Sequence, residues 1–143
     1  MATIGDVVAE KGAVVNQIAP GDTVFDAVRT MVEANCGSLL VIKDGEIVGI
    51  ITERDYLRRI AIEGRTSKDT LVQEIMTAPV IYVEPYCEVE EALALMTDRH
   101  IRHLPVVSGG KLLGLISIGD LVWYQTKEQS FQIRYLEDYI SGR

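Results

Sequence analysis

Two places in the sequence pair a hydroxyl residue with an acid three positions later, each directly after a short apolar run. Thr52 precedes Asp55, and Ser117 precedes Asp120. Where a strand gives way to a helix, this spacing is typical of a capping box, although Glu is the more usual acid. The same geometry also suits a nucleotide, because a helix N-terminus can hold a phosphate while the carboxylate accepts hydrogen bonds from ribose hydroxyls. Spacing alone leaves both interpretations open.

Both motifs belong to a stretch that occurs twice. The segment from Ile18 to Leu57 aligns without a gap with the segment from Val83 to Val122, at a shift of 65 residues (85 − 20 = 65 for the two prolines). Matching positions keep their chemistry over the whole length. This duplication predicts two copies of one supersecondary unit, packed face to face about a pseudo-twofold axis. We therefore expect function in the cleft that the copies share.

The first copy predicts the element order strand, helix, strand, strand, helix. Asp22 is a good N-cap for a helix with apolar residues at helical spacing through Val32. An Asp-Gly turn then joins a strand at 38–42 to a strand at 47–51. A second helix is expected from Thr52 to about Glu63, with Gly64 ending it.

The second copy predicts the same order. The expected elements are a helix at 88–99, strands at 104–107 and 112–116, and a helix beginning at Ser117. The first strands are expected at 14–18 and 80–83, and short helices opened by Thr3 and Thr70 precede the two copies. The apolar face of 127–140 is too wide to be left in water, so we expect it to pack on the body or on a second subunit.

These elements predict a mixed α/β fold of the α+β type. The expected segments are an N-terminal helix (1–12), the first repeat (13–64), a linker with a short helix (65–77), the second repeat (78–126) and a C-terminal helix (127–143). The length fits one compact domain, or two half-domains that each lack the bulk to bury a core alone. The repeat favours the two half-domains.

Composition excludes several classes of function. The formal charge is 14 − 21 = −7, which argues against nucleic-acid binding. No apolar run approaches the roughly 20 residues of a membrane helix, and the N-terminus has no signal pattern. We therefore expect a soluble cytoplasmic protein without membrane contact. Cys36 and Cys87 lack metal-type spacing, and with His100 and His103 as the only histidines no metal site is expected.

The duplicated unit resembles a tandem pair of CBS domains, the Bateman module, from about Lys11 to Gln125. The resemblance rests on the endings Gly49-Ile-Ile-Thr-Glu-Arg-Asp55 and Gly114-Leu-Ile-Ser-Ile-Gly-Asp120, and on the run Arg102-His-Leu-Pro-Val106. It implies two pseudo-twofold-related β-α-β-β-α repeats packed sheet to sheet, with two clefts that bind adenosine-containing ligands such as AMP, ADP, ATP, NAD or S-adenosylmethionine. No cofactor is required.

The resemblance also implies which residues line each cleft. The first cleft comprises Thr52, Arg54, Asp55, Met76, Thr77, Pro79, Ile81, Arg102, His103 and Pro105. The second comprises Lys11, Gly12, Val14, Asn16, Gly37, Ser38, Leu39, Ile116, Ser117 and Asp120. The shift of 65 places Gly37 and Ser38 on Arg102 and His103, which are expected to contact phosphate. We therefore expect unequal clefts, the second being roomier and less cationic.

The function that follows is a ligand-sensing regulatory module, in which a bound adenine nucleotide stabilises one arrangement of the repeats. The resemblance implies a homodimer, and the regulated protein is unidentified. The alternative is a dimeric interaction or scaffold protein that has kept the fold without binding a ligand. An enzyme is not expected, because the sequence has no nucleophile with a nearby base and no P-loop.

Overall fold

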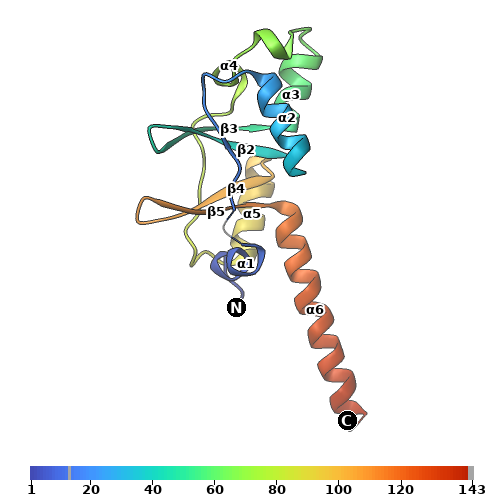
Figure 1. Cartoon of the computed structure of the whole chain (residues 1–143). Coiled ribbons are helices and arrows are strands. Elements are labelled where there is room, and N and C mark those ends of the chain that lie inside the picture. The colour runs from blue at the N-terminus through green and yellow to red at the C-terminus, as the bar shows by residue number, and fades with distance from the viewer. Residues whose placement is uncertain (13, 142–143) are drawn as a thin grey trace. The chain divides into compact units, whose positions relative to one another are not determined.

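The computed structural model describes residues 1–12 and 14–141 and divides the chain into two compact units. The first-repeat unit is Val14–Ile81, and the second-repeat unit combines Met1–Ala13 with Tyr82–Arg143. Each unit holds one copy of the duplicated stretch together with the short helix that precedes the other copy in the sequence (Figure 1). The expected boundary at residue 13 and the end of the expected segment 127–143 lie outside the described residues.

A three-stranded sheet forms the centre of the first-repeat unit. Its strands are β1 (Gln17–Ile18), β2 (Ser38–Lys43) and β3 (Glu46–Thr52), with β1 parallel and β3 antiparallel to β2. Asp44 and Gly45 form the β2–β3 turn with φ angles of 53° and 79°. Two successive positive φ angles are what a tight Asp-Gly hairpin turn requires, as the sequence predicts.

The helices of this unit are α2 (Val24–Ala34), α3 (Glu53–Tyr56), a π-helix η1 (Leu57–Ala61), a short 3-10 helix η2 (Ser67–Asp69) and α4 (Val72–Ile75). The expected single helix from Thr52 to Glu63 is wrong in its second half, because Ile62 N–H bonds to the Leu57 carbonyl five residues earlier. Val72 and Ile75 of α4 are buried in one core with Val24, Ala27 and Met31 of α2 and with Leu39, Val41 and Ile51 of the sheet.

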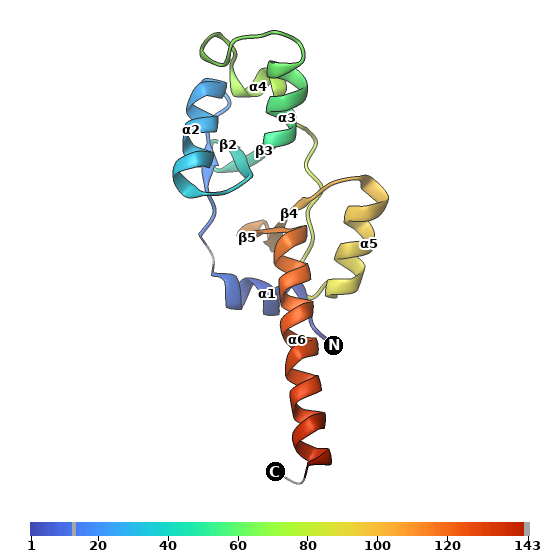
Figure 2. The same ribbon diagram turned by 90° about the vertical axis from the view of Figure 1, so that its right-hand side faces the viewer.

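The second-repeat unit contains α1 (Ile4–Lys11), α5 (Val89–Arg99), β4 (His103–Ser108), β5 (Lys111–Ser117) and α6 (Ile118–Ile140). β4 and β5 pair antiparallel, with His103 opposite Ser117. Helix α1 packs against β5 and α6 (Figure 2). Ile4 N–H also donates to the Cys87 carbonyl at 2.8 Å, and Ile4 and Val7 are buried. The N-terminal helix is therefore part of the core of this unit.

Helix α6 is continuous across residues 126 and 127, where the sequence suggested a boundary between the second repeat and a separate helix. Leu121 and Tyr124 of its first turns are buried. Every described residue from Gln129 onward is exposed. The wide apolar face at 127–140 therefore does not pack on the body of its own unit.

Three further expectations about element ends are corrected. The N-cap of α2 is Thr23 rather than Asp22, because the Thr23 hydroxyl accepts Asp26 N–H while the Asp22 carboxylate accepts Ala19 N–H in the preceding turn. Helix α4 begins after Leu71 rather than Thr70. The expected strand at 80–83 is reduced to a single bridge, Val83 with Val106, because a turn begins at Glu84.

Candidate functional site

A capping box is present at the strand-to-helix junction of both repeats. Thr52 N–H donates to Asp55 Oδ2 at 3.0 Å, and Asp55 N–H donates to Thr52 Oγ1 at 3.2 Å. The corresponding distances between Ser117 and Asp120 are 2.8 and 3.1 Å. The structural role that the spacing suggested is therefore real. A carboxylate has about four acceptor positions, so this role leaves acceptor capacity for a ligand.

In the first-repeat unit, the junction lies beside the segment that follows α4. Thr77 forms a two-way backbone bridge with Ile50, at 2.8 and 3.0 Å, which brings the Thr77 hydroxyl to 3.1 Å from Asp55 Oδ1. Met76 packs against Gly49, where an added Cβ would lie 2.5 Å from the Met76 sulfur. Four of the predicted first-cleft residues, Thr52, Asp55, Met76 and Thr77, are thus brought together.

The other first-cleft residues of this unit lie at its surface. Arg54, in the first turn of α3, is exposed and makes no ion pair among the residues that the structure describes. Pro79 is exposed and Ile81 is half-buried, farther along the segment after Thr77. Their place in the first cleft remains a prediction.

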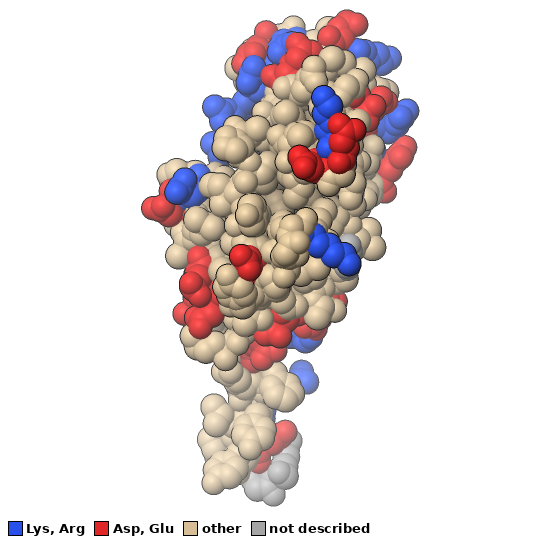
Figure 3. Space-filling model, turned by 90° about the vertical axis from the view of Figure 1, so that its left-hand side faces the viewer, with Lys and Arg blue, Asp and Glu red and all other residues tan. Residues whose placement is uncertain are grey.

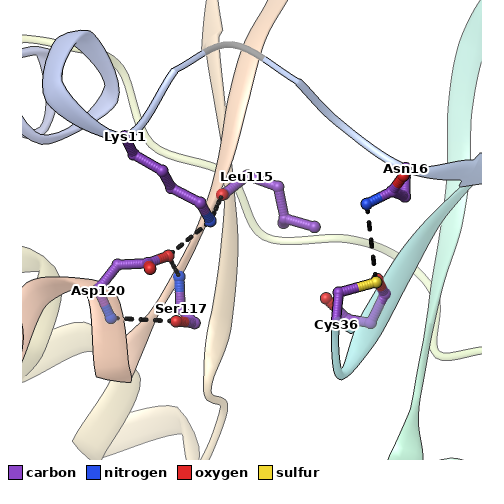
Figure 4. Close-up of polar contacts among 7 residues, drawn as sticks. Lys11, Asn16, Cys36, Leu115, Ser117 and Asp120 are labelled. Carbon is purple, nitrogen blue, oxygen red and sulfur yellow. Dashed lines mark hydrogen bonds and ion pairs between the residues drawn. The ribbon is translucent and has the colours of Figure 1, made fainter. Parts of the chain in front are cut away.

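In the second-repeat unit, a lysine holds the acid of the junction (Figure 4). Lys11 Nζ lies 2.6 Å from Asp120 Oδ2 and donates to the Leu115 carbonyl at 2.7 Å. Partial burial alone would raise the pKa of Asp120, but the hydrogen bond from Lys11 and the Ser117 N–H outweigh it, so this pKa lies below its ordinary value. Asp120 is therefore a carboxylate held in place by the ammonium group of Lys11.

His103 belongs to the same electrostatic environment. Burial lowers the pKa of His103, the positive charge of Lys11 lowers it further, Asp120 opposes this and Arg102 adds to it. A neutral imidazole at pH 7 is a weaker phosphate contact than the charged one that the sequence suggested. Arg102 is exposed, and its carbonyl accepts Ile118 N–H at 2.8 Å. Pro105 is buried within β4.

The remaining second-cleft residues have varied environments. Gly12 ends α1 with a φ of 99°, and Val14 is 84% exposed. The Asn16 side-chain amide faces Cys36 Sγ at 3.7 Å (Figure 4), and the Gly37 carbonyl accepts Glu53 N–H at 3.1 Å. Ser38 is buried opposite Thr52 in the β2–β3 register. Leu39 and Ile116 are fully buried. Their place in the second cleft stays a prediction.

Comparison with known proteins identifies the fold. The family model described as the CBS domain matches residues 6–62 and 72–127. The chain belongs to the CBS-domain family. It is 44% identical over 149 residues to the mitochondrial CBS domain-containing protein CBSX3 of Arabidopsis thaliana, covering 98% of this chain and 72% of that protein.

Solved structures of CBS-domain proteins agree. A protein with CBS domains from Burkholderia ambifaria MC40-6 superimposes with a TM-score of 0.87 at 46% identity, covering 90% of this chain and 96% of that one. The hexameric CBS-CP12 protein from bloom-forming cyanobacteria gives a TM-score of 0.78 at 33% identity, covering 86% and 72%. CBS-domain pairs are generally regulatory proteins of signal transduction rather than catalysts.

The two CBS repeats differ in the group that meets the acid of the junction. Asp120 meets the ammonium group of Lys11, where Asp55 meets the hydroxyl group of Thr77. The two short helices correspond at a shift of 68 rather than 65, because Val8 lies against Gly114 as Met76 (8 + 68 = 76) lies against Gly49. Lys11 therefore lies beyond the helix positions that the two units share. Sequence reasoning placed Lys11 in the second cleft and missed its pairing with Asp120.

Other kinds of site find no support in the described part of the chain. No group of three or more metal-ligating side chains lies together within residues 1–12 and 14–141. Among the described helices, none has the length and apolar character needed to span a membrane.

Proposed function

We propose that this CBS-domain pair is a ligand-sensing regulatory module that binds an adenosine-containing nucleotide, AMP, ADP, ATP or NAD, in clefts completed by both repeats. The observation that carries the proposal is the duplicated junction, in which a hydroxyl and a carboxylate are fixed at the start of a helix. The boxes at Thr52 and Ser117 orient each acid and leave it acceptor capacity. Two ribose-binding acids in matching places suit two related nucleotide sites.

The helix ends support the phosphate part of this proposal. At the start of α6, Ile118 N–H and Asp120 N–H are bonded within the protein, which leaves Gly119 N–H as a first-turn donor that has no protein acceptor within residues 1–12 and 14–141. The space around the Gly119 Cα is open apart from the Ser117 hydroxyl. A phosphate could therefore approach this helix end, which carries a partial positive charge.

The cations of the two sites differ in position. Arg54 aligns with Gly119 (54 + 65 = 119), so the first site carries an exposed cation in the helix turn, whereas the second carries Lys11 beside its acid. We propose that this difference makes the two sites unequal in affinity. Lys11 offsets the charge of Asp120, which would otherwise repel the phosphate of a nucleotide.

Calorimetric titration with AMP, ADP, ATP, NAD, S-adenosylmethionine and adenosine tests the proposal. Asp55→Ala and Asp120→Ala are each expected to weaken binding at their own site about 10- to 100-fold, because each removes a charged hydrogen-bond acceptor. Asp6→Ala is the matched control, since Asp6 forms the same kind of capping box with Thr3 in α1. Unchanged binding in both site variants would refute the assignment of these acids.

The scaffold alternative is favoured by one specific observation. The capping boxes by themselves account for an acid and a hydroxyl at each junction, without any ligand. A parent protein that binds none of the six compounds would support this alternative and overturn the nucleotide proposal.

The remaining parts of the proposal concern the setting of the protein. We propose that it acts as a homodimer, in the cytoplasm, on a regulated protein still to be identified, and that it has no catalytic activity, cofactor, nucleic-acid or membrane partner. The hexameric state of the CBS-CP12 relative supports self-association in general. The mitochondrial relative CBSX3 makes location an open experimental question, which fractionation of cells that express the tagged chain would answer.

A further inference from the structure

A small open pocket lies in the second-repeat unit, where residues 1–2, the start of α5 and the middle of α6 meet. Figure 2 shows the N-terminus beside these two helices. The Ala2 carbonyl accepts Val89 N–H at 3.1 Å, and Thr3 forms a bridge with Glu88, so the N-terminal residues are fixed against α5. The pocket has a volume of about 140 Å³, and the acids of the two proposed nucleotide sites do not line it.

Acids and amides line this pocket from two sides. Glu88 and Glu90 belong to the start of α5, and Glu128 lies on α6 among three glutamines, Gln125, Gln129 and Gln132. The acids of α5 suit the partial positive charge of a helix start, but Glu128 lies inside a long helix, where no such charge is present. None of the three glutamates forms an ion pair within residues 1–12 and 14–141.

Negative charge is also prominent on the rest of this unit. On the face of the second-repeat unit that Figure 3 shows, acidic side chains (red) gather in larger patches than basic ones (blue). Carboxylates that face one pocket repel one another, because the protein walls screen their charges less than water does. A bound cation would remove this repulsion, so the charge of the pocket indicates a positively charged occupant.

A buried hydroxyl group gives independent evidence for a bound molecule. Tyr124 lines the pocket and is only 9% exposed. Its hydroxyl group makes no hydrogen bond to any other described residue, although buried tyrosine hydroxyls usually have a partner. Burial raises the pKa of Tyr124, and the negative charges of Glu128 and Asp6 raise it further, so the hydroxyl stays protonated at neutral pH.

The size and the acceptors of the pocket select the occupant. One water molecule takes about 30 Å³, so about 140 Å³ holds roughly five non-hydrogen atoms, too few for a nucleobase. Within the described residues, no group of three acidic, histidine or cysteine side chains is placed to hold a metal ion. A guanidinium group has five N–H donors in a planar fork and can reach carboxylates on opposite sides. We propose that the pocket binds the guanidinium group of an arginine-type ligand, between Glu88 of α5 and Glu128 of α6.

The other lining groups suit this ligand as well. The Tyr124 hydroxyl and the side-chain carbonyls of the glutamines accept further N–H groups. Val89 and the Tyr124 ring give an apolar wall for the flat face of the guanidinium group and for the methylene next to it. The ligand is either a free guanidinium compound or an arginine side chain of another protein. Neither source depends on nucleotide binding at Asp55 or Asp120.

NMR titration of the full chain at 0.15 M salt tests the proposal. The probes are butylguanidinium, its matched amine butylammonium, and the peptide acetyl-Gly-Arg-Gly-amide. Butylguanidinium is expected to cause saturable shifts at the amides of Val89 and Gln125, with a dissociation constant on the order of 1 mM, because a few charged hydrogen bonds form in an open pocket. Glu128→Gln is expected to weaken binding about tenfold, and Tyr124→Phe about threefold.

Glu137→Gln is the matched control, because it removes the same charge from an exposed position of α6 outside the pocket. It is expected to leave binding unchanged within about twofold. Equal weakening by Glu137→Gln and Glu128→Gln would overturn the site, since only the net charge would then matter. Equal affinity for butylammonium would overturn the choice of a guanidinium group. The melting temperatures of the variants show whether each one is folded.

The peptide distinguishes the two sources of the ligand. Tighter binding of acetyl-Gly-Arg-Gly-amide than of butylguanidinium supports an arginine of a partner protein, because the peptide backbone then adds contacts outside the pocket. Binding of butylguanidinium alone supports a free small molecule. Absence of saturable shifts with both compounds overturns the proposal.

Discussion

Replacing Lys11 with methionine keeps an unbranched side chain and removes the ammonium group from Asp120. The two charged atoms lie 2.6 Å apart, and the side chains are 39% and 27% exposed. Coulomb attraction at such a distance is several kcal/mol at an effective dielectric constant near 20, but exposure, desolvation and side-chain entropy reduce the net value of such pairs to about 1 kcal/mol or less. We expect Lys11→Met to lower the free energy of unfolding by about 1 kcal/mol at pH 7, at the upper end of that range because Lys11 also bonds to the Leu115 carbonyl.

The pH dependence of this destabilisation identifies the ion pair with Asp120 as its cause. The pKa of Asp120 in the folded state lies below its ordinary value of 3.8, so this stabilisation is present above that value and is lost as pH falls through the lower folded pKa. Urea unfolding followed by circular dichroism should therefore show the full difference between parent and variant at pH 7, and a narrowing difference below about pH 4. Carbon-13 NMR titration should show a higher pKa for Asp120 in the variant, where burial is no longer outweighed by Lys11.

Lys111→Met is the matched control, because Lys111 is exposed and forms no ion pair among the described residues. It should change neither the stability at pH 7 nor the titration of Asp120. The reasoning is refuted if Lys11→Met leaves the titration midpoint of Asp120 unchanged, or if the destabilisation is the same at pH 7 and pH 3.

Three further predictions concern Gly49, His103 and Thr77. Gly49→Ala should destabilise the protein by about 1–3 kcal/mol, because the new Cβ would lie 2.5 Å from the Met76 sulfur. Gly114→Ala should destabilise it less in the same urea assay, because its Cβ would lie 3.2 Å from a Val8 methyl group. The pKa of His103 in the folded chain lies below its ordinary value of 6.5, so the unfolded chain binds a proton at this site first as the pH is lowered. The free energy of unfolding should therefore decrease as the pH falls below 6.5, and His103→Gln should reduce this decrease in thermal melts between pH 7 and 5. Thr77→Val removes the hydroxyl donor to Asp55 and should lower the free energy of unfolding by about 1 kcal/mol in the same urea assay; an unchanged value would contradict the contact.

The sequence predicted the hairpin turns and the capping boxes well, because both depend on residues a few positions apart. The hairpin turns at Asp44-Gly45 and Gly109-Gly110 have the positive φ angles that such sequences favour, and the boxes that begin with Thr52 and Ser117 form as their spacing predicts. Two of the errors concern the partner of a single local group. Asp22 bonds to a turn instead of capping α2, and the helix after Thr52 widens into a π-helix.

The sequence by itself determined the duplication, the place of the two acids and their hydroxyl partners, because repeats, turns and caps depend on residues a few positions apart. Only the tertiary structure decided that α1 packs with the second repeat and α4 with the first, since the apolar stripe of a short helix does not reveal which core it enters. That exchange is what brings Lys11 to Asp120, 109 positions away, and Thr77 to Asp55. Contacts of this range depend on the packing of whole elements, and so the asymmetry between the two acids became visible only in the folded chain.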